Sequence, residues 1–378
     1  MATTFKTFLD DDIVSTRTLL HENIPITGTI VSGSSYGTSS LKTYTHGMFQ
    51  TVYDYPYLSS SANQLFDLTI GQTIDSPASA STSVDPFNKK KVNIYNQMAQ
   101  VLAGHDTSGS IVQFDRDGDP ATGGDKFNSM FFINFSRLLV KDEIKKRSFQ
   151  ITLGVNSSSV SPFNATCLVS DASGTTNYKI NSPAGEYGLL YATTFSSASA
   201  GWTVAASQSV GFVFYQAGVV ALSTAIFAQS SSNSPSTSLS ASTYGQIKNG
   251  YVVNFSASSG TPYTNIETMF ESGSINDCCS ALRNRIQNIT FNNTTELNST
   301  IHFCRINHND FNYSSNPTYL SSSQIRVKNG DIAKAPISYM TTVGLYSPDN
   351  ELLAVAKLSE PLKKDPTQEM ILRVRLDY

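Results

Sequence analysis

The clearest alternation of apolar and polar residues lies at the C-terminal end of the chain. Residues 338–346, 351–358 and 370–378 alternate with a period of two, which predicts three strands, the first two joined by a turn at 347–350. Chain ends usually fray, so a strand pattern that continues to the last residue indicates that the C-terminus is built into a sheet.

Two kinds of sheet could hold this last strand. It either belongs to the core of a domain or adds to the exposed edge of a neighbouring subunit. In the second case one face of the strand and the terminal residue would contact the neighbour. The candidate interface residues are Ile371, Arg373, Arg375 and Tyr378.

Helical spacing of apolar residues predicts a helix at 92–103, ended by Gly104 in a left-handed cap. Shorter helices are expected at 141–146 and 276–285. A compact hairpin is expected at 210–222, with Gly218 where a positive φ is needed. Further strands are expected at 24–31, 130–135, 148–153, 166–169, 178–180, 189–192, 289–291 and 298–304.

These elements predict a mainly β protein made of antiparallel, β-sandwich-like domains with a few short helices as a minor α+β component. Parallel sheets would need a crossover helix between most strand pairs, and the helices are too few. The 378 residues allow two or three domains. We expect an N-terminal α+β segment with an aromatic-rich arm (1–155), a β-rich region with a Ser/Thr-rich insertion (156–227), a Ser-rich loop or linker (228–243) and a C-terminal β domain (244–378).

Composition narrows the classes of partner. Charged residues make up 15% of the chain and the net charge is −3, which gives no electrostatic reason to expect a nucleic-acid partner. Tyr and Phe number 18 and 21, as in β proteins with large contact surfaces. No signal peptide and no long apolar run are present, so we expect synthesis and folding in a reducing cytoplasm, without a membrane. The four cysteines are expected to be buried free thiols.

One acidic loop is a candidate metal site. Asp115, Asp117 and Asp119 occupy alternate positions around Gly118, an arrangement of hard oxygen ligands that resembles calcium loops. The neighbourhood lacks the Glu and the flanking helices of an EF-hand. A turn with solvated carboxylates is the favoured interpretation and a structural Ca²⁺ the alternative, and no other cofactor is expected.

The other candidate metal-binding residues and the known catalytic motifs give no support for an enzyme. His302, Cys304 and His308 lie close in sequence, but a fourth zinc ligand is missing nearby and packing of Cys304 in a core is favoured. The motifs of acyl transfer, nucleotide binding and metalloproteolysis do not occur. A glycosidase is left as an alternative, because its two catalytic carboxylates are brought together by the fold and need no particular spacing in the sequence.

Several segments resemble a family of virion structural proteins of T4-like tailed phages that infect marine cyanobacteria. The resemblance covers most of the chain outside 157–208 and 228–243. The segments that carry it are KTFLDDDIV (6–14), TYTHGMF (43–49), FYQAGVV (214–220), ITFNNTTELN (289–298) and the strand pair at 341–357.

The resemblance implies a non-enzymatic virion subunit, present in many copies, that contacts other virion proteins and forms a homo-oligomer in the particle. A tail, baseplate or neck connector that links the tail to fibres is expected first, and an outer capsid decoration protein is the alternative. A tailspike-type protein that binds or degrades host polysaccharide is less favoured, because no β-solenoid period is present. A receptor-binding fibre tip is the least favoured interpretation, since no long trimeric repeat occurs in the sequence.

Overall fold

The computed structural model is mainly β, as the sequence predicted. It describes residues 5–27, 40–74, 86–118, 126–154, 163, 166–196, 209–227, 273–313, 320–321, 324–325 and 335–378. Strands make up 50% and helices 14% of the structure, and the sheets are antiparallel with few short helices. Among the described residues, no helix is both long and apolar enough to cross a membrane.

The chain divides into two compact units. Unit 1 comprises Met1–Leu20 and Glu296–Tyr378, and unit 2 comprises His21–Thr295. Two long strands, β1 (Ile13–Thr27) and β12 (Ile286–Ile306), contribute residues to both. Unit 1 therefore joins the two ends of the sequence, whereas each of the four segments expected above is contiguous. That segmentation stays a prediction.

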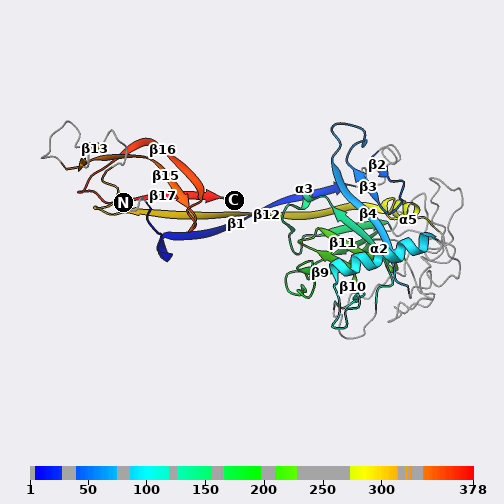
Figure 1. The fold of residues 1–378 in the computed structure, drawn as a ribbon. Helices are drawn as coiled ribbons and strands as arrows, with labels where there is room; N and C mark the ends of the chain where they lie inside the picture. The colour runs from blue at the N-terminus through cyan, green and yellow to red at the C-terminus, as the bar shows by residue number, and fades with distance from the viewer. Residues whose placement is uncertain are drawn as a thin grey trace. The chain divides into compact units, whose positions relative to one another are not determined.

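Unit 2 is built on one antiparallel sheet (Figure 1). Strands β2 to β5 form one meander and β7 to β11 another; β5 pairs with β11, and β7 pairs with β12. The strands are β2 (Leu41–Thr43), β3 (Gln50–Tyr53), β4 (Gln64–Gln72), β5 (Ser129–Phe135), β7 (Gln150–Gly154), β8 (Thr166–Ser170), β9 (Tyr187–Ser196), β10 (Ser209–Phe214) and β11 (Val219–Ser223).

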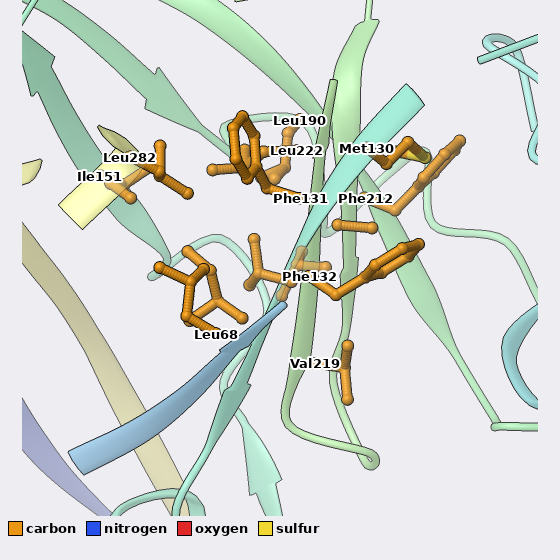
Figure 2. Close-up of a cluster of buried hydrophobic side chains, with 14 of the residues drawn as sticks. Leu68, Met130, Phe131, Phe132, Ile151, Leu190, Phe212, Val219, Leu222 and Leu282 are labelled. Atoms are coloured by element: carbon orange, nitrogen blue, oxygen red, sulfur yellow. The ribbon is translucent and has the colours of Figure 1, made fainter. Parts of the chain in front are cut away.

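The central strands are near-continuous apolar runs because both faces of the sheet are covered. Every residue of β10 and β11 is buried, and in β5 only Asn134 is exposed. Figure 2 shows Phe131, Phe132 and Phe212 in this core, together with Leu282 from a helix. The predicted hairpin is confirmed, with Gly218 at φ +66° between β10 and β11.

Two helices, α2 (Pro86–Leu102) and α5 (Ile275–Arg283), contact β4. Gly71 in β4 permits the close approach of α2, since a Cβ placed there would lie 2.7 Å from the backbone nitrogen of Tyr95. Gly104 ends α2 at φ +88° and donates its N–H to the Ala99 carbonyl, as the predicted cap requires. Both predicted helices are confirmed, although α2 begins six residues earlier than expected, at Pro86.

The helix predicted at 141–146 is wrong. Helix α3 (Arg137–Val140) ends where Lys141 adopts φ +60°, and β6 (Glu143–Ile144) follows. The N–H groups of Asp142 and Lys145 donate to carbonyls of β12, so strand pairing takes the backbone groups that a helix would need.

Four strand predictions also change. The strands expected at 289–291 and 298–304 are parts of the single strand β12. At 178–180 the structure has one isolated bridge, Lys179 with Tyr187, in place of a strand. The strand expected at 24–31 is the end of β1, and its last four positions lie outside the described residues, as does the Ser-rich segment at 228–243.

Unit 1 contains the three predicted C-terminal strands, β15 (Ser338–Tyr346), β16 (Leu352–Lys364) and β17 (Met370–Asp377). β15 and β16 form a hairpin, while β17 pairs antiparallel with β12 from Ser299↔Asp377 to Ile306↔Met370. The C-terminus is thus built into a sheet of its own chain. The smaller elements of unit 1 are a 3-10 turn (Asp10–Asp12), β13 (Leu320–Ser321) and β14 (Gln324–Ile325); in unit 2, a second 3-10 turn spans Thr224–Phe227.

Candidate functional site

Unit 1 leaves most of its large apolar side chains exposed. Within its described residues the buried apolar side chains are Ile306, Leu345 and Val374. The exposed ones are Phe5, Leu9, Ile13, Val14, Leu19, Leu20, Leu297, Phe311, Tyr313, Tyr339, Tyr346, Leu352, Leu353, Val355, Leu362, Ile371 and Tyr378. So many exposed apolar side chains in one unit make unit 1 a candidate for an interaction with another protein.

The β15–β16 hairpin concentrates part of this surface near its turn. Pairing places Val343 with Ala356 and Leu345 with Ala354 on the less exposed face. On the other face Tyr346 and Leu352 lie together, and the Phe5 ring contacts Tyr346 edge-on at 4.9 Å between centroids. We call Phe5, Tyr346, Leu352, Leu353 and Val355 the hairpin patch.

A tight turn holds the patch at the end of the hairpin. The Ser347 N–H donates to the Glu351 carbonyl over 2.9 Å, and Asn350 adopts φ +65°. Asn tolerates this left-handed conformation better than most residues. Because the turn is closed by its own backbone, the patch side chains are presented by an ordered element.

The predicted interface residues on β17 have mixed surroundings. Ile371 and Tyr378 are 61% and 74% exposed, and Arg373 is exposed as well. Arg375 instead donates to Asp377 and to the Ser299 hydroxyl of its own chain, and the Tyr378 hydroxyl lies 3.0 Å from that of Thr300. All four point away from the face that carries the buried Val374 or lie at the strand end, so their assignment as an interface stays a prediction.

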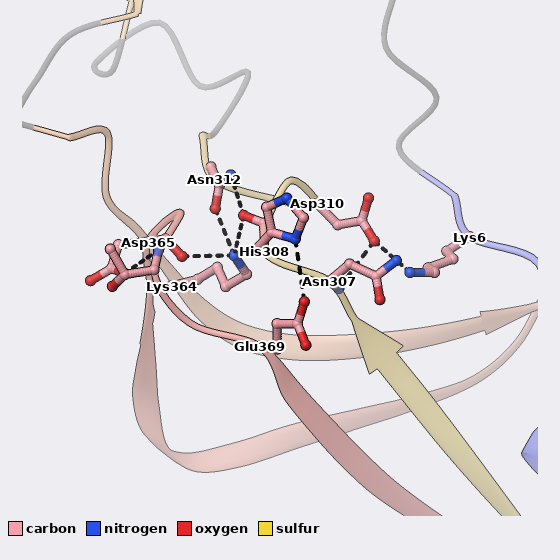
Figure 3. Close-up of polar contacts among 9 residues, drawn as sticks. Lys6, Asn307, His308, Asp310, Asn312, Lys364, Asp365 and Glu369 are labelled. Atoms are coloured by element: carbon pink, nitrogen blue, oxygen red, sulfur yellow. Dashed lines mark hydrogen bonds and ion pairs between the residues drawn. The ribbon is translucent and has the colours of Figure 1, made fainter.

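A buried lysine orders the turn that follows β12 (Figure 3). Lys364 has no exposed surface, and its ammonium donates to the carbonyls of His308 and Asp365 and to the Asn312 side-chain oxygen, at 3.1, 2.8 and 2.7 Å. Lys6 pairs with Asp310, and His308 with Glu369, around the same turn. These contacts tie the N-terminal arm and the β16–β17 connection to the end of β12.

Sequence reasoning missed this arrangement, because two adjacent lysines such as Lys363 and Lys364 usually lie on a solvated surface. The Lys364 ammonium is surrounded by three oxygen atoms, each of which accepts one of its hydrogen bonds. A fully buried charge is tolerated only when such partners replace its hydration.

The candidate calcium loop is only partly described. Asp115 is buried and its carboxylate pairs with Lys126 at 2.5 Å, while its other oxygen accepts the Asp117 N–H. Burial raises the pKa of the Asp115 carboxyl, which Lys126 opposes. Asp119 lies outside the described residues. No group of three potential metal-ligating side chains occurs in the described part of the chain.

The cysteines and histidines of the zinc interpretation are not gathered into one site. His302 packs against the Phe8 ring at 5.3 Å, and Cys304 is partly buried. Cys167, Cys278 and Cys279 are buried thiols, as predicted. Burial raises the pKa of Cys167 to about 12 and that of Cys278 to about 11, so neither is a reactive thiolate near neutral pH.

Unit 2 contains one buried carboxylate that sequence reasoning missed. Asp171 accepts the N–H groups of Arg147 and Phe149 at 2.7 and 3.0 Å, and the Tyr215 hydroxyl donates to it over 3.1 Å. Burial raises the pKa of this carboxyl although all three donors favour its ionised form. It fixes the turn before β7 against the end of β8, which is a structural role.

A small cavity lies in unit 2 beside the Asp115 loop. It has a volume of about 30 Å³ and is lined by Phe114, Tyr187, Phe212, Phe214 and neighbouring residues. This volume holds one or two water molecules, whereas ligand pockets are roughly 300 Å³ or larger. The exposed apolar surface of unit 1 is therefore the stronger candidate site.

Comparison of the chain with protein-family models finds no match, and comparison with curated proteins and with solved structures finds none either.

Proposed function

We propose that this chain is a non-enzymatic structural subunit of a tailed-phage virion, a tail, baseplate or neck connector that links the tail to fibres. The observation that carries the proposal is the exposed apolar surface of unit 1. The resemblance of the sequence segments quoted above supplies the class of particle.

The physical reason is the small core of unit 1. Burial of one large apolar side chain stabilises a structure by about 1.5–3 kcal/mol. Unit 1 gains this from few side chains, while the hairpin patch and the faces of β1 stay in water. A partner that covers these side chains would supply the missing stabilisation, which suits an element that becomes fully ordered on assembly.

The exposed area is sufficient for a specific contact. A half-exposed aromatic or large aliphatic side chain presents on the order of 100 Å². The exposed apolar side chains of unit 1 together exceed the roughly 800 Å² per partner of a standard interface. Unit 1 is therefore proposed as the assembly element of the subunit.

Particle incorporation tests this proposal. The double variant Tyr346→Ser/Leu353→Ser removes two exposed side chains of the hairpin patch, so the fold should persist while the subunit content of purified particles falls about tenfold. The matched control is Leu58→Ser/Leu138→Ser, which removes two comparably exposed leucines from unit 2. Equal incorporation of both variants would show that the patch does not attach the subunit.

A further inference from the structure

Strand β1 is an edge strand that is exposed over most of its length (Figure 1). It pairs with β12 on one side, and no other strand in the described part of the chain pairs with it. Every residue from Ile13 to Asn23 is exposed. These residues include four large apolar side chains that are 42–51% exposed, those of Ile13, Val14, Leu19 and Leu20. An edge of this kind presents unpaired N–H and C=O groups with which another strand can pair.

The N-terminal half of this edge lacks the usual protection against pairing with other chains. We call residues 13–20 the β1 edge stretch. Edge strands are commonly protected by free charged side chains or by proline. The single charged side chain of the β1 edge stretch, that of Arg17, forms an ion pair with Glu296 of β12, and Pro25 lies beyond the stretch. The stretch is therefore open to a further strand.

Two residues of β1 show which backbone groups face the free edge. The Glu22 N–H donates to the Asn293 side chain over 3.1 Å, which directs it toward β12. Pro25 has no N–H, and proline in a sheet is tolerated where that N–H would face away from the neighbouring strand. Because successive residues direct their N–H and C=O groups to opposite sides, the odd-numbered residues of β1 face the free edge.

Contacts with β12 indicate that this alternation is not interrupted between Thr16 and Glu22. The Thr16 hydroxyl donates to the Ser299 carbonyl, and a His21 ring nitrogen lies 3.2 Å from the Thr294 hydroxyl. The step from Thr16 to His21 along β1 equals the step from Ser299 to Thr294 along β12, as antiparallel strands without a bulge require. Side chains two positions apart in the β1 edge stretch therefore share a face.

A two-fold axis through Thr16 matches the β1 edge stretch with itself. In antiparallel pairing about this axis, the residues that lie opposite each other are Ile13 and Leu19, Val14 and Thr18, and Ser15 and Arg17, each pair formed twice. The odd-numbered pairs exchange the backbone hydrogen bonds that the free edge leaves unmade. Apolar pairs stabilise such a contact, and no like charges meet in it. An axis through Arg17 would instead place the two arginines opposite each other.

We propose that the β1 edge stretch pairs antiparallel with the same stretch of a second copy of this chain, about a two-fold axis at Thr16. The inference rests on the proposed assembly role of unit 1 and names a partner for part of its surface. The contact is isologous, since the same residues serve both copies. It is shorter than a standard interface, so the free chain should form a weak dimer that the high subunit density of a particle favours.

Disulfide trapping tests the register with the full chain. Thr16→Cys places two thiols opposite each other on the axis, in a pair without backbone hydrogen bonds, where side chains lie closest. Cβ atoms of directly opposite residues are about 4.5–5.5 Å apart, so small movements allow a disulfide. Under mild oxidation we expect most of this variant to run as a covalent dimer on a non-reducing gel. Wild type measures the background from the partly buried Cys304.

Thr18→Cys is the matched control for the register. It changes another exposed threonine on the same face of β1, but in the proposed pairing each new thiol lies opposite Val14. The two thiols of the dimer are then about 13 Å apart along the strands, too far for a disulfide. This variant should trap no more dimer than wild type does.

A proline variant tests whether the backbone edge makes the contact. Ser15→Pro removes an N–H that faces the free edge and leaves the groups that face β12 in place. In the Thr16→Cys background it should reduce the trapped dimer at least tenfold, while hydrogen exchange of β12 stays as in wild type. Ser15→Ala in the same background keeps the N–H and should trap dimer as fully as Thr16→Cys alone.

The outcomes are distinct from those of particle incorporation. No trapping of Thr16→Cys, equal trapping of Thr18→Cys, or trapping that Ser15→Pro does not reduce would overturn the β1 pairing, while a connector that binds another virion protein still stands. Register-specific trapping of a chain that is absent from particles would keep the pairing and overturn the virion role.

Discussion

At the scale of single residues, buried polar groups decide how the ends of the strands are held. Lys364 and Asp171 are both fully buried charges, and each is surrounded by three hydrogen-bond partners. Neither was predictable, because a sequence shows the type of a side chain but not the carbonyl and N–H groups that the fold brings to it. Cysteine burial was predictable, since free cysteine is among the most buried residue types.

Substitution of Lys364 tests the role of the ammonium. Lys364→Met keeps the length of the side chain but removes the donor to the Asp365 carbonyl and the Asn312 side-chain oxygen, and one of two donors to the His308 carbonyl, so unfolding should cost about 2–3 kcal/mol less. Urea unfolding measures the loss, and hydrogen exchange locates it at 307–313. Lys363→Met removes an exposed lysine and should change stability by less than about 1 kcal/mol. Equal effects of the two variants would refute the assigned role.

The Tyr215 hydroxyl tests the buried carboxylate. Tyr215→Phe removes one donor to Asp171 and should lower stability by about 1–2 kcal/mol near pH 7. Burial already raises the pKa of Asp171 in the folded state, and loss of the hydroxyl raises it further. Asp171 is then harder to ionise in the folded variant than in the folded wild type. The loss of unfolding free energy relative to wild type is therefore present above the folded pKa of Asp171 and shrinks as the pH falls through that pKa.

Denaturant unfolding at several pH values measures this dependence. Tyr191→Phe, which removes a partly buried hydroxyl outside this contact, is the control and should show no such trend. A Tyr215→Phe deficit that stays constant down to acidic pH would contradict ionisation of Asp171.

At the scale of elements, periodicity predicted well where local and tertiary preferences agree. The alternation of residues in β17 correctly predicted a strand with one face turned inward. Gly104 and Gly218 correctly predicted positions with a positive φ, which few other residues adopt readily. The helix predicted at 141–146 does not form, because pairing with β12, about 150 positions away in the sequence, overrides the helix propensity of these side chains. Two strands were expected in place of the single strand β12, because the polar residues in its middle resemble a loop between strands.

Gly71 tests the packing of α2 on β4. Gly71→Ala forces a methyl group against the Tyr95 backbone and should destabilise unit 2 by about 1–3 kcal/mol. Gly344→Ala is the control, since its new methyl meets only the ends of the exposed Tyr346 and Leu352 side chains, which can move. Thermal unfolding compares the two. A tolerated Gly71→Ala would show that the helix can shift away from the sheet.

Removal of β17 tests whether the terminal strand is structural. Deletion of 370–378 exposes β12 from Ser299 to Ile306 and removes the buried Val374, so unit 1 should lose its order and the chain should not enter particles. Limited proteolysis and particle composition are the measurements. Arg373→Ser, which changes an exposed side chain but keeps the pairing of β17 with β12, should leave the proteolysis pattern of unit 1 unchanged. Normal assembly of the truncated chain would exclude a structural role for the strand.

At the scale of the whole molecule, the two units differ in how they are stabilised. Unit 2 has an extensive apolar core, whereas unit 1 holds its large apolar side chains on the surface. Composition could indicate large contact surfaces but could not say which strands carry them, because exposure depends on pairings between distant segments. The predicted mainly β class needed only the element pattern, while the candidate site needed the fold.

Localisation of the chain in intact phage particles tests the central claim most directly. A tag visible by electron microscopy, placed in unit 2 at the exposed turn near Leu58, leaves the hairpin patch of unit 1 unaltered. We expect the tag at the neck or baseplate of the tail. A signal over the whole head would replace the connector with a capsid decoration, and the absence of the chain from particles would contradict a virion role.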